Sequence, residues 1–326
     1  MGEPVGQDFI RRVTTEDFRA VARALTIVEN DSWTYGEWWS VISGRLGGAY
    51  IVGLTGWPGV GKSTLMGRIL EHVSPDDGYV GVVAVDPSSH RTGGAVLGDR
   101  LRMMTTVLQP NIFIRSLASR GSQSGVSKAT LRAIDIMDAA GFHWIFVETV
   151  GVGQTQVDIL ELADAVVLVT APGLGDEVQA IKAGILEIPD LIVVNMADRP
   201  EAHRTVAGLR WALGHSPENR GRIIETVAVK DVGTAELWSV LRTLQASNAS
   251  AVIKERRRAR QRRRALMFAE EMWERSISTA LSTAEVHELL YGALAETNDP
   301  YDVGVQIVRR ALEYLSEEEV LGRNSK

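Results

Sequence analysis

The chain of 326 residues contains no cysteine. Disulfide bridges, thiol catalysis and cysteine-ligated zinc are therefore excluded, and a reducing, cytoplasmic setting is expected. Histidine is also scarce: the six histidines are scattered and form no H-E-x-x-H motif or close pair. We therefore expect no histidine metal site.

Long apolar runs are missing as well. No stretch approaches the roughly 18 uninterrupted apolar residues that a membrane-spanning helix needs. The first residues, Met1 to Asp8, include acids and lack the apolar segment of a secretory signal. The sequence thus predicts a soluble, cytoplasmic protein that makes no membrane contact. A formal net charge of −6 disfavours a general nucleic-acid coat, although Lys254 to Arg264 is rich in arginine.

Three zones can be distinguished by their patterning. Residues 1–48 and 247–326 show apolar residues at three- and four-residue steps, which indicates helical extensions at both ends. Residues 49–246 instead alternate short β-branched runs with helical patterns, which is typical of an α/β fold with a mostly parallel sheet. The expected strands are 49–55, 79–85, 144–147, 165–170, 191–194 and 223–227. Ligands bind such sheets at the carboxyl ends of the strands.

The first expected strand runs directly into a phosphate-binding pattern, G-x-x-x-x-G-K-[ST]. Its residues are Gly56, Trp57, Pro58, Gly59, Val60, Gly61, Lys62, Ser63 and Thr64. Glycines let backbone amides point at phosphate oxygens, and the helix that follows adds its own unpaired amides. Lys62 is the expected partner of the β- and γ-phosphates, and the Ser63 hydroxyl is an expected Mg²⁺ ligand. The pattern predicts a nucleoside triphosphate site.

Acidic residues end the next strands. Asp86 follows the second strand, where a carboxylate can hold Mg²⁺ directly or through water. Glu148 follows the third strand, with Gly151 three residues later. This spacing is typical of a Walker B and switch II arrangement, in which the acid orders the Mg²⁺ shell and the glycine amide contacts the γ-phosphate. Arg115 and Arg120 offer two further cations near the glycine-rich loop 93–103.

The loop after the fifth strand reads Asn195-Met196-Ala197-Asp198. Guanine-specific GTPases have N-K-x-D here, and the aspartate accepts two hydrogen bonds that adenine cannot donate. Met196 replaces the lysine, so it can keep the apolar contact with the purine while losing the charge. Guanine preference with reduced affinity is expected. The last base-contacting loop is then expected at Val227, Ala228 and Val229, after the sixth strand.

The order of these motifs resembles that of the MeaB/ArgK-type GTPases, relatives of the methylmalonic aciduria type A protein. The resemblance rests on G-W-P-G-V-G-K-S-T, V-D-P-S-S, G-G-x-x-L-G-D-R, E-T-V-G-V-G-Q and P-G-x-G-D-E. It implies a P-loop GTPase of the SIMIBI/G3E type that serves as chaperone to an adenosylcobalamin-dependent acyl-CoA mutase, gating cofactor loading and protecting the mutase. A homodimer formed through the C-terminal arm is implied as well.

The resemblance also extends the site. It implies a Mg²⁺ set of Ser63, Asp86, Asp99 and Glu148, and a third switch at 173–182 in which Lys182 couples to the mutase. The residues reveal no catalytic base in the chain itself, so Gln154 and Lys182 are candidates for positioning water or charge once the mutase docks. Slow GTP hydrolysis that the partner accelerates is therefore expected.

Departures from the family pattern, chiefly Met196 and the large Trp57, suggest a diverged branch. Its client would then be a mutase such as 2-hydroxyisobutyryl-CoA or isobutyryl-CoA mutase. Two other classes compete with this interpretation. A metal-insertion GTPase or a kinase would share the P-loop but have no mutase client, and ATP preference would point that way. Nucleic-acid binding through the arginines of 254–264 is the third hypothesis, disfavoured by the acidic whole.

Overall fold

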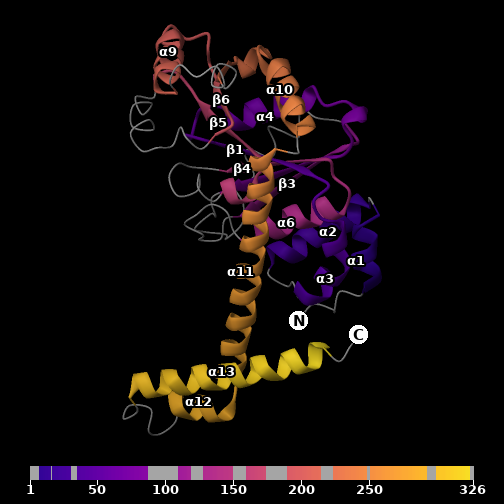
Figure 1. Cartoon of the computed structure of the whole chain (residues 1–326), viewed down its shortest axis with the longest axis vertical. Helices are drawn as coiled ribbons and strands as arrows, with labels where there is room; N and C mark the ends of the chain where they lie inside the picture. Colours follow the sequence, from indigo (N-terminus) through magenta and orange to yellow (C-terminus); the bar gives the residue numbers. More distant parts are fainter. Residues whose placement is uncertain are drawn as a thin grey trace. The chain divides into compact units, whose positions relative to one another are not determined.

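The computed structural model describes residues 7–15, 17–30, 35–86, 109–118, 128–149, 159–173, 189–213, 223–247, 250–291 and 299–323. It consists of two compact units, Met1–Arg260 and Gln261–Lys326. The first unit contains a sheet with helices around it, and the second is helical (Figure 1). Among the described residues, no helix is both long and apolar enough to cross a bilayer.

The sheet has seven strands, and every pair of neighbours runs parallel. Their order across the sheet is β3-β2-β4-β1-β5-β6-β7. In chain order they are β1 (Tyr50–Gly56), β2 (Val80–Asp86), β3 (Ile112–Ala118), β4 (Trp144–Thr149), β5 (Ala165–Thr170), β6 (Leu191–Val194) and β7 (Ile223–Glu225). The predicted α/β fold with a parallel sheet and helical extensions is confirmed.

The edge strand β3 was not among the predicted strands. Its apolar start, Ile112 to Ile114, is followed by Arg115 and Ser116, and this polar interruption hides the strand in the sequence. Arg115 donates to the Glu29 carboxylate at 2.6 Å and to the Thr26 hydroxyl at 3.2 Å. Its cation, expected near the glycine-rich loop, therefore holds α2 (Phe18–Glu29) against the sheet edge. Arg120 lies outside the described residues.

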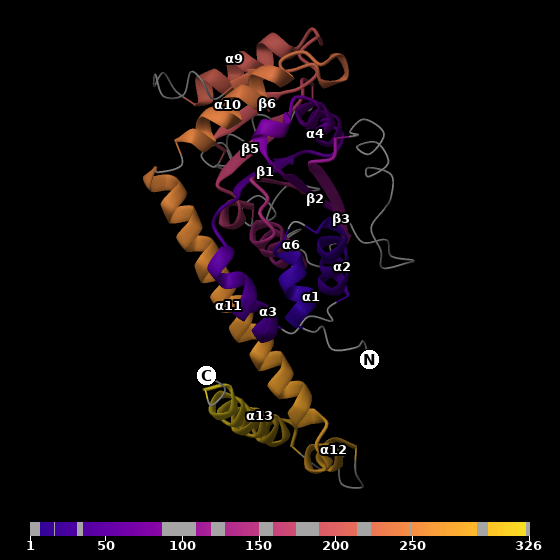
Figure 2. The same ribbon diagram turned by 90° about the vertical axis from the view of Figure 1, so that its right-hand side faces the viewer.

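Helices cover both faces of the sheet (Figures 1 and 2). On one face, α4 (Lys62–Glu71) packs beside α10 (Thr234–Ala246), and on the other lie α2 and α6 (Lys128–Ala139). Trp144 of β4 and Trp238 of α10 meet with ring centroids 4.7 Å apart in the first core. Apolar burial on both faces explains why β1 and β4 are buried along their whole length.

The remaining elements of the first unit are short. They are α1 (Gln7–Val13), α3 (Tyr35–Ile42), η1 (Ser43–Arg45), η2 (Pro75–Asp77), α9 (Ala202–Ala212) and η5 (Ala228–Lys230). The N-terminal helices join the sheet through Asp138 of α6, whose carboxylate accepts from the amides of Gly47 at 2.6 Å and Ala49 at 2.9 Å. This contact fixes the entry into β1.

The start of α11 (Ala251–Leu281) is attached to the sheet by arginines. Arg257 and Arg260 donate to the fully buried Asp164 carboxylate at 3.2 and 2.5 Å. Arg256 donates to Asp190 at 2.6 Å and to the Asp164 carbonyl at 2.8 Å. Three cations of the 254–264 cluster thus have carboxylate partners within the chain, which favours a structural role over nucleic-acid binding.

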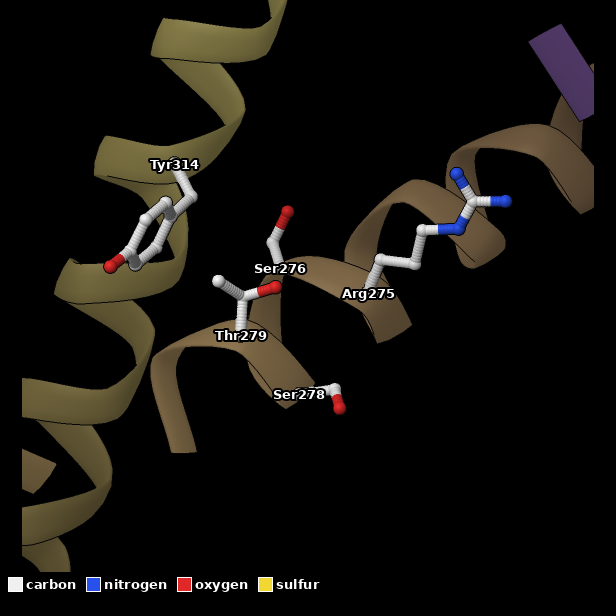
Figure 3. Close-up of a pocket in the computed structure, with 5 residues that line it drawn as sticks. All are labelled: Arg275, Ser276, Ser278, Thr279 and Tyr314. Carbon is white, nitrogen blue, oxygen red and sulfur yellow. The ribbon is translucent and has the colours of Figure 1, made fainter. Parts of the chain in front are cut away.

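The second unit contains the rest of α11 together with α12 (Ala284–Tyr291) and α13 (Pro300–Arg323). Arg310 of α13 pairs with Glu285 of α12 at 3.5 Å. A pocket of about 180 Å³ lies between α11 and α13, lined by Arg275, Ser276, Ser278, Thr279 and Tyr314. Thr279 lies next to the Tyr314 ring, whereas the Arg275 guanidinium points away from it (Figure 3).

Candidate functional site

The P-loop is shaped by two glycines that leave no room for a side chain. Gly56 has a φ of 146°, and a Cβ there would stand 2.1 Å from the Val169 carbonyl oxygen of β5. Gly61 has a φ of 88°, and its Cβ would stand 2.6 Å from the Asn195 amide nitrogen. Both positions require glycine because of left-handed backbone and close neighbours. The loop therefore packs directly on β5 and on the 195–198 segment.

Lys62 begins α4, directly after Gly61 as the N-cap. Its side chain is 6% exposed, and its ammonium group donates to the carbonyls of Gly56 at 2.8 Å and Trp57 at 3.1 Å. The cation is thus held inside the curve of the loop, at the amino end of a helix. A helix N-terminus with a buried lysine beside it is a strongly anion-attracting position.

Ser63 and Glu148, both predicted to serve the Mg²⁺ site, are in direct contact. The Ser63 hydroxyl donates to the Glu148 carboxylate at 2.7 Å. Strands β1 and β4 are neighbours with Leu54 opposite Glu148, so the P-loop and the acidic strand end meet at one edge. Glu148 is 5% exposed. A hydroxyl and a carboxylate oxygen are the hard donors that Mg²⁺ prefers, so this pair fits the ion chemically.

Other predicted residues of the phosphate and metal site are only partly described. Asp86 ends β2 next to β4, at the same edge of the sheet. Asp99, Gly151, Gln154 and Lys182 lie outside the described residues. Within the P-loop, Pro58, Gly59 and Thr64 are exposed and Val60 is buried. The large ring of Trp57, unexpected in the sequence, is half-buried against the main core cluster.

Asn195 is a structural connector. Its amide nitrogen donates to the Val60 carbonyl of the P-loop at 2.8 Å. Its amide oxygen accepts from the Thr226 hydroxyl at 3.1 Å and from the Ala228 amide at 3.0 Å. The side chain, 3% exposed, therefore joins the P-loop to the loop after β7. The predicted place of Asn195 in the base site stays a prediction, and the geometry adds these contacts between loops.

Asp198 has a cationic neighbour that the sequence interpretation missed. The Lys230 ammonium group donates to the Asp198 carboxylate at 2.8 Å. This hydrogen bond holds the pKa of the Asp198 carboxyl below its usual value. Lys230 ends η5, one position past the predicted base loop. The sequence signal for this contact was a lysine directly after the expected base-contacting segment. The pairing itself could not be predicted, because Asp198 and Lys230 lie on two separate loops.

The predicted base loop divides into two parts. Val227 and Ala228 are buried, and the Ala228 amide is used by Asn195. Val229, in contrast, is 69% exposed and is the member of the three whose side chain is open to a ligand. Met196, opposite this loop, has a positive φ of 57°, and its terminal methyl lies 4.0 Å from where a Cβ on Gly61 would stand.

Comparison with known proteins relates the chain to GTPases. The profile of a family described as methylmalonyl Co-A mutase-associated GTPase MeaB matches residues 21–282. A Pyrococcus abyssi protein whose name describes it as a GTPase is 41% identical over 312 residues, 94% of this chain and 96% of that protein. The mitochondrial methylmalonic aciduria type A homolog of Mus musculus is 35% identical over 60% of this chain and 48% of its own length.

Among solved structures, one described as a LAO/AO transport system kinase matches with a TM-score of 0.62. The match covers 97% of this chain and 98% of that one at 24% sequence identity. At this identity the likeness concerns the fold alone. The overall fold of the present chain is therefore one already known from a solved structure.

Proposed function

The chain belongs to the family of methylmalonyl-CoA mutase-associated GTPases named MeaB, and on that premise we propose that it binds GTP with Mg²⁺ and hydrolyses it to time the maturation of a mutase. The observation that carries the proposal is the Ser63–Glu148 hydrogen bond of 2.7 Å beside the buried Lys62 ammonium. Phosphate, metal and hydrolysis chemistry all require these three groups at one place.

Each group has a defined part in this proposal. Lys62 neutralises charge on the β- and γ-phosphates, and the amides that open α4 bind phosphate oxygens. Ser63 and Glu148 would hold Mg²⁺, with Asp86 and Asp99 as further predicted members of its shell. When bound, Mg²⁺ supplies positive charge that offsets the charge of the transferring phosphoryl group. Gly151 remains the predicted contact with the γ-phosphate.

The proposed base site is formed by the loops that follow β6 and β7. Asp198 accepts from the guanine edge, Asn195 fixes the loops around it, and Met196 and Val229 supply apolar surface. Because adenine lacks the matching donors, it would form no such hydrogen bonds with the Asp198 carboxylate, so GTP is preferred over ATP. Binding measurements with both nucleotides test this, and a preference for ATP contradicts it.

The proposed partner is an adenosylcobalamin-dependent acyl-CoA mutase, in the cytoplasm. Support comes from the family description and from the name of the mouse relative. Gln154 and Lys182 are the proposed residues that position water or charge when the mutase docks. Three mutases are candidate clients: methylmalonyl-CoA mutase, 2-hydroxyisobutyryl-CoA mutase and isobutyryl-CoA mutase.

The decisive experiment measures the GTPase rate of the full chain alone and with each of these three mutases in turn. We expect a slow rate that at least one mutase increases at least tenfold, as partners that complete a catalytic site do. A Lys62→Ala variant should show no rate in either condition. If no mutase changes the rate while GTP still binds, the chain is a P-loop GTPase with another client, and the chaperone proposal fails.

The same proposal includes a homodimer formed through the C-terminal arm. Tyr301, Val305, Val308 and Leu312 recur on α13 at steps of four, three and four, which places them on one face of the helix. These side chains are 78%, 39%, 42% and 54% exposed in the single chain. An exposed apolar stripe of this length is typical of a surface that a second subunit covers.

A further inference from the structure

The base site contains a cation, Lys230, that lies outside the four-residue N-K-x-D motif. In N-K-x-D proteins the cation of the motif stands one residue after the asparagine, and this chain has Met196 there. We propose that Lys230 takes the place of the missing motif lysine and holds the Asp198 carboxylate in the orientation that the guanine edge requires. This inference rests on the guanine nucleotide site proposed above.

Met196 itself brings no cation to the base site. Its side chain packs against the main core cluster, and its terminal methyl lies beside Gly61 of the P-loop. Met196 is partly buried, and methionine suits this apolar contact without a charge to be desolvated. A cation for Asp198 therefore comes from another segment, and Lys230 is the partner in the structure.

The segment that provides the cation is rigidly fixed. Thr226 and the 195–198 loop are joined by backbone hydrogen bonds from Thr226 to Val194 at 2.9 Å and from Ala197 to Thr226 at 3.0 Å. The η5 turn that follows is closed by a bond from the Lys230 amide to the Val227 carbonyl at 2.8 Å. These bonds hold the turns carrying Asp198 and Lys230 next to each other before any ligand arrives.

Contacts from α4 add to this support. The Arg68 guanidinium donates to the Ala228 carbonyl at 3.2 Å, and His72 lies 3.0 Å from the Asp231 carboxylate just after the turn. Asp231 has a positive φ of 55° and caps the turn together with Thr234. The Lys230 side chain thus extends from a preorganised support, which reduces the entropy lost when it holds a partner.

Among the described residues, Lys230 is the cation that hydrogen-bonds the Asp198 carboxylate. The adjacent Arg199 directs its guanidinium to the Pro172 carbonyl at 3.5 Å. Lys230 and Asp198 are 62% and 42% exposed, and an exposed ion pair of this kind contributes little to folding. Removing the Lys230 charge should therefore leave the fold intact and change ligand binding, which makes the inference testable.

The test compares GDP with inosine diphosphate in the full chain with Mg²⁺ present, by calorimetric titration. Guanine donates two hydrogen bonds to Asp198, and hypoxanthine donates one. Lys230→Met should weaken GDP binding about fivefold, the upper range for one exposed charge pair. It should weaken inosine diphosphate binding less, so the preference for GDP falls. Lys230→Arg keeps a cation and should retain the preference, whereas Lys254→Met, at an exposed site on α11, is the matched control.

A double-mutant cycle with Asp198→Ala separates the possible outcomes. If Lys230 acts through Asp198, Lys230→Met has no effect once Asp198 is absent. Equal weakening in both backgrounds would overturn the inference, because Lys230 would then act on another part of the nucleotide. Unchanged GDP affinity in Lys230→Met would also overturn it. A wild-type chain without preference for GDP over ADP would instead contradict the proposed guanine site, whatever Lys230 does.

Discussion

At the scale of the residue, Gly56 occupies a position with no room for a side chain. Its φ of 146° and the 2.1 Å that would separate an added Cβ from the Val169 carbonyl oxygen leave no space for alanine. Gly59 has a φ of 81° but no neighbouring atom within 4 Å of such a Cβ. The two glycines of one loop thus differ in steric surroundings, although the sequence motif treats them alike.

We expect Gly56→Ala to lower the free energy of unfolding by about 3 kcal/mol or more, because a backbone carbonyl on β5 must shift. Gly59→Ala should cost only about 1 kcal/mol, the strain of a left-handed backbone without a clash. Urea unfolding of the nucleotide-free chain measures both. Equal losses in the two variants would contradict the packing of the P-loop on β5.

Much of the phosphate site could be predicted from the sequence, because the strand, loop and helix that form it are contiguous. Lys62 and Ser63 were placed by their motif, and Glu148 by its position at a strand end. Asn195 was assigned to the base site by its motif, but its bonds to the P-loop and to the loop after β7, and the pairing of Lys230 with Asp198, could not be predicted in this way. Their partners lie on other loops, which the order of the strands in the sheet brings together.

At the scale of the element, the start of α11 depends on buried charge. Asp164 is fully buried between Arg257 and Arg260, and buried charges that lose a partner are costly. The sequence alone does not tell which arginines of the run 254–264 are buried. Because side chains of a helix point in different directions, the same run contains both buried residues such as Arg260 and exposed ones such as Arg258.

This difference gives a matched pair of variants. Arg260→Met should lower the free energy of unfolding by about 3 kcal/mol, since it removes one partner of a buried carboxylate. Arg258→Met, on the same helix, should cost less than about 0.5 kcal/mol because Arg258 is 75% exposed and pairs with Glu255 only at 3.6 Å. Thermal or urea unfolding distinguishes them. Similar costs would show that the arginine contacts with Asp164 carry no stability.

The properties of a single element also explain why strand β3 was not predicted. Strand β3 lies at the sheet edge, where one side has no strand neighbour, and its Arg115 faces α2. Buried central strands such as β6 are continuous in apolarity and were predicted with their ends, while an edge strand tolerates polar residues. Periodicity alone therefore missed the edge strand with a polar interruption, whereas the apolar start of the other edge strand, β7, was recognised.

At the scale of the whole molecule, the apolar stripe of α13 predicts the oligomeric state. We expect the wild-type chain to have twice the chain mass in solution, and Val308→Glu with Leu312→Glu to give a monomer, because two charges would have to be buried in the interface. Light scattering after size exclusion measures this. Gln306→Glu, an exposed change on the same helix, should leave the dimer intact. A wild-type monomer would contradict the proposed role of the arm.

The contact between β1 and Asp164 in the first unit can be followed in solution by hydrogen exchange. The Ile51 amide, near the start of the P-loop strand, donates at 3.0 Å to the same Asp164 carboxylate that Arg257 and Arg260 hold. Its exchange with deuterium should therefore be slow while α11 is attached and should accelerate in Arg260→Met. A single amide signal would thus report, without any nucleotide or partner, how firmly the arginine helix is joined to the strand that ends in the phosphate loop.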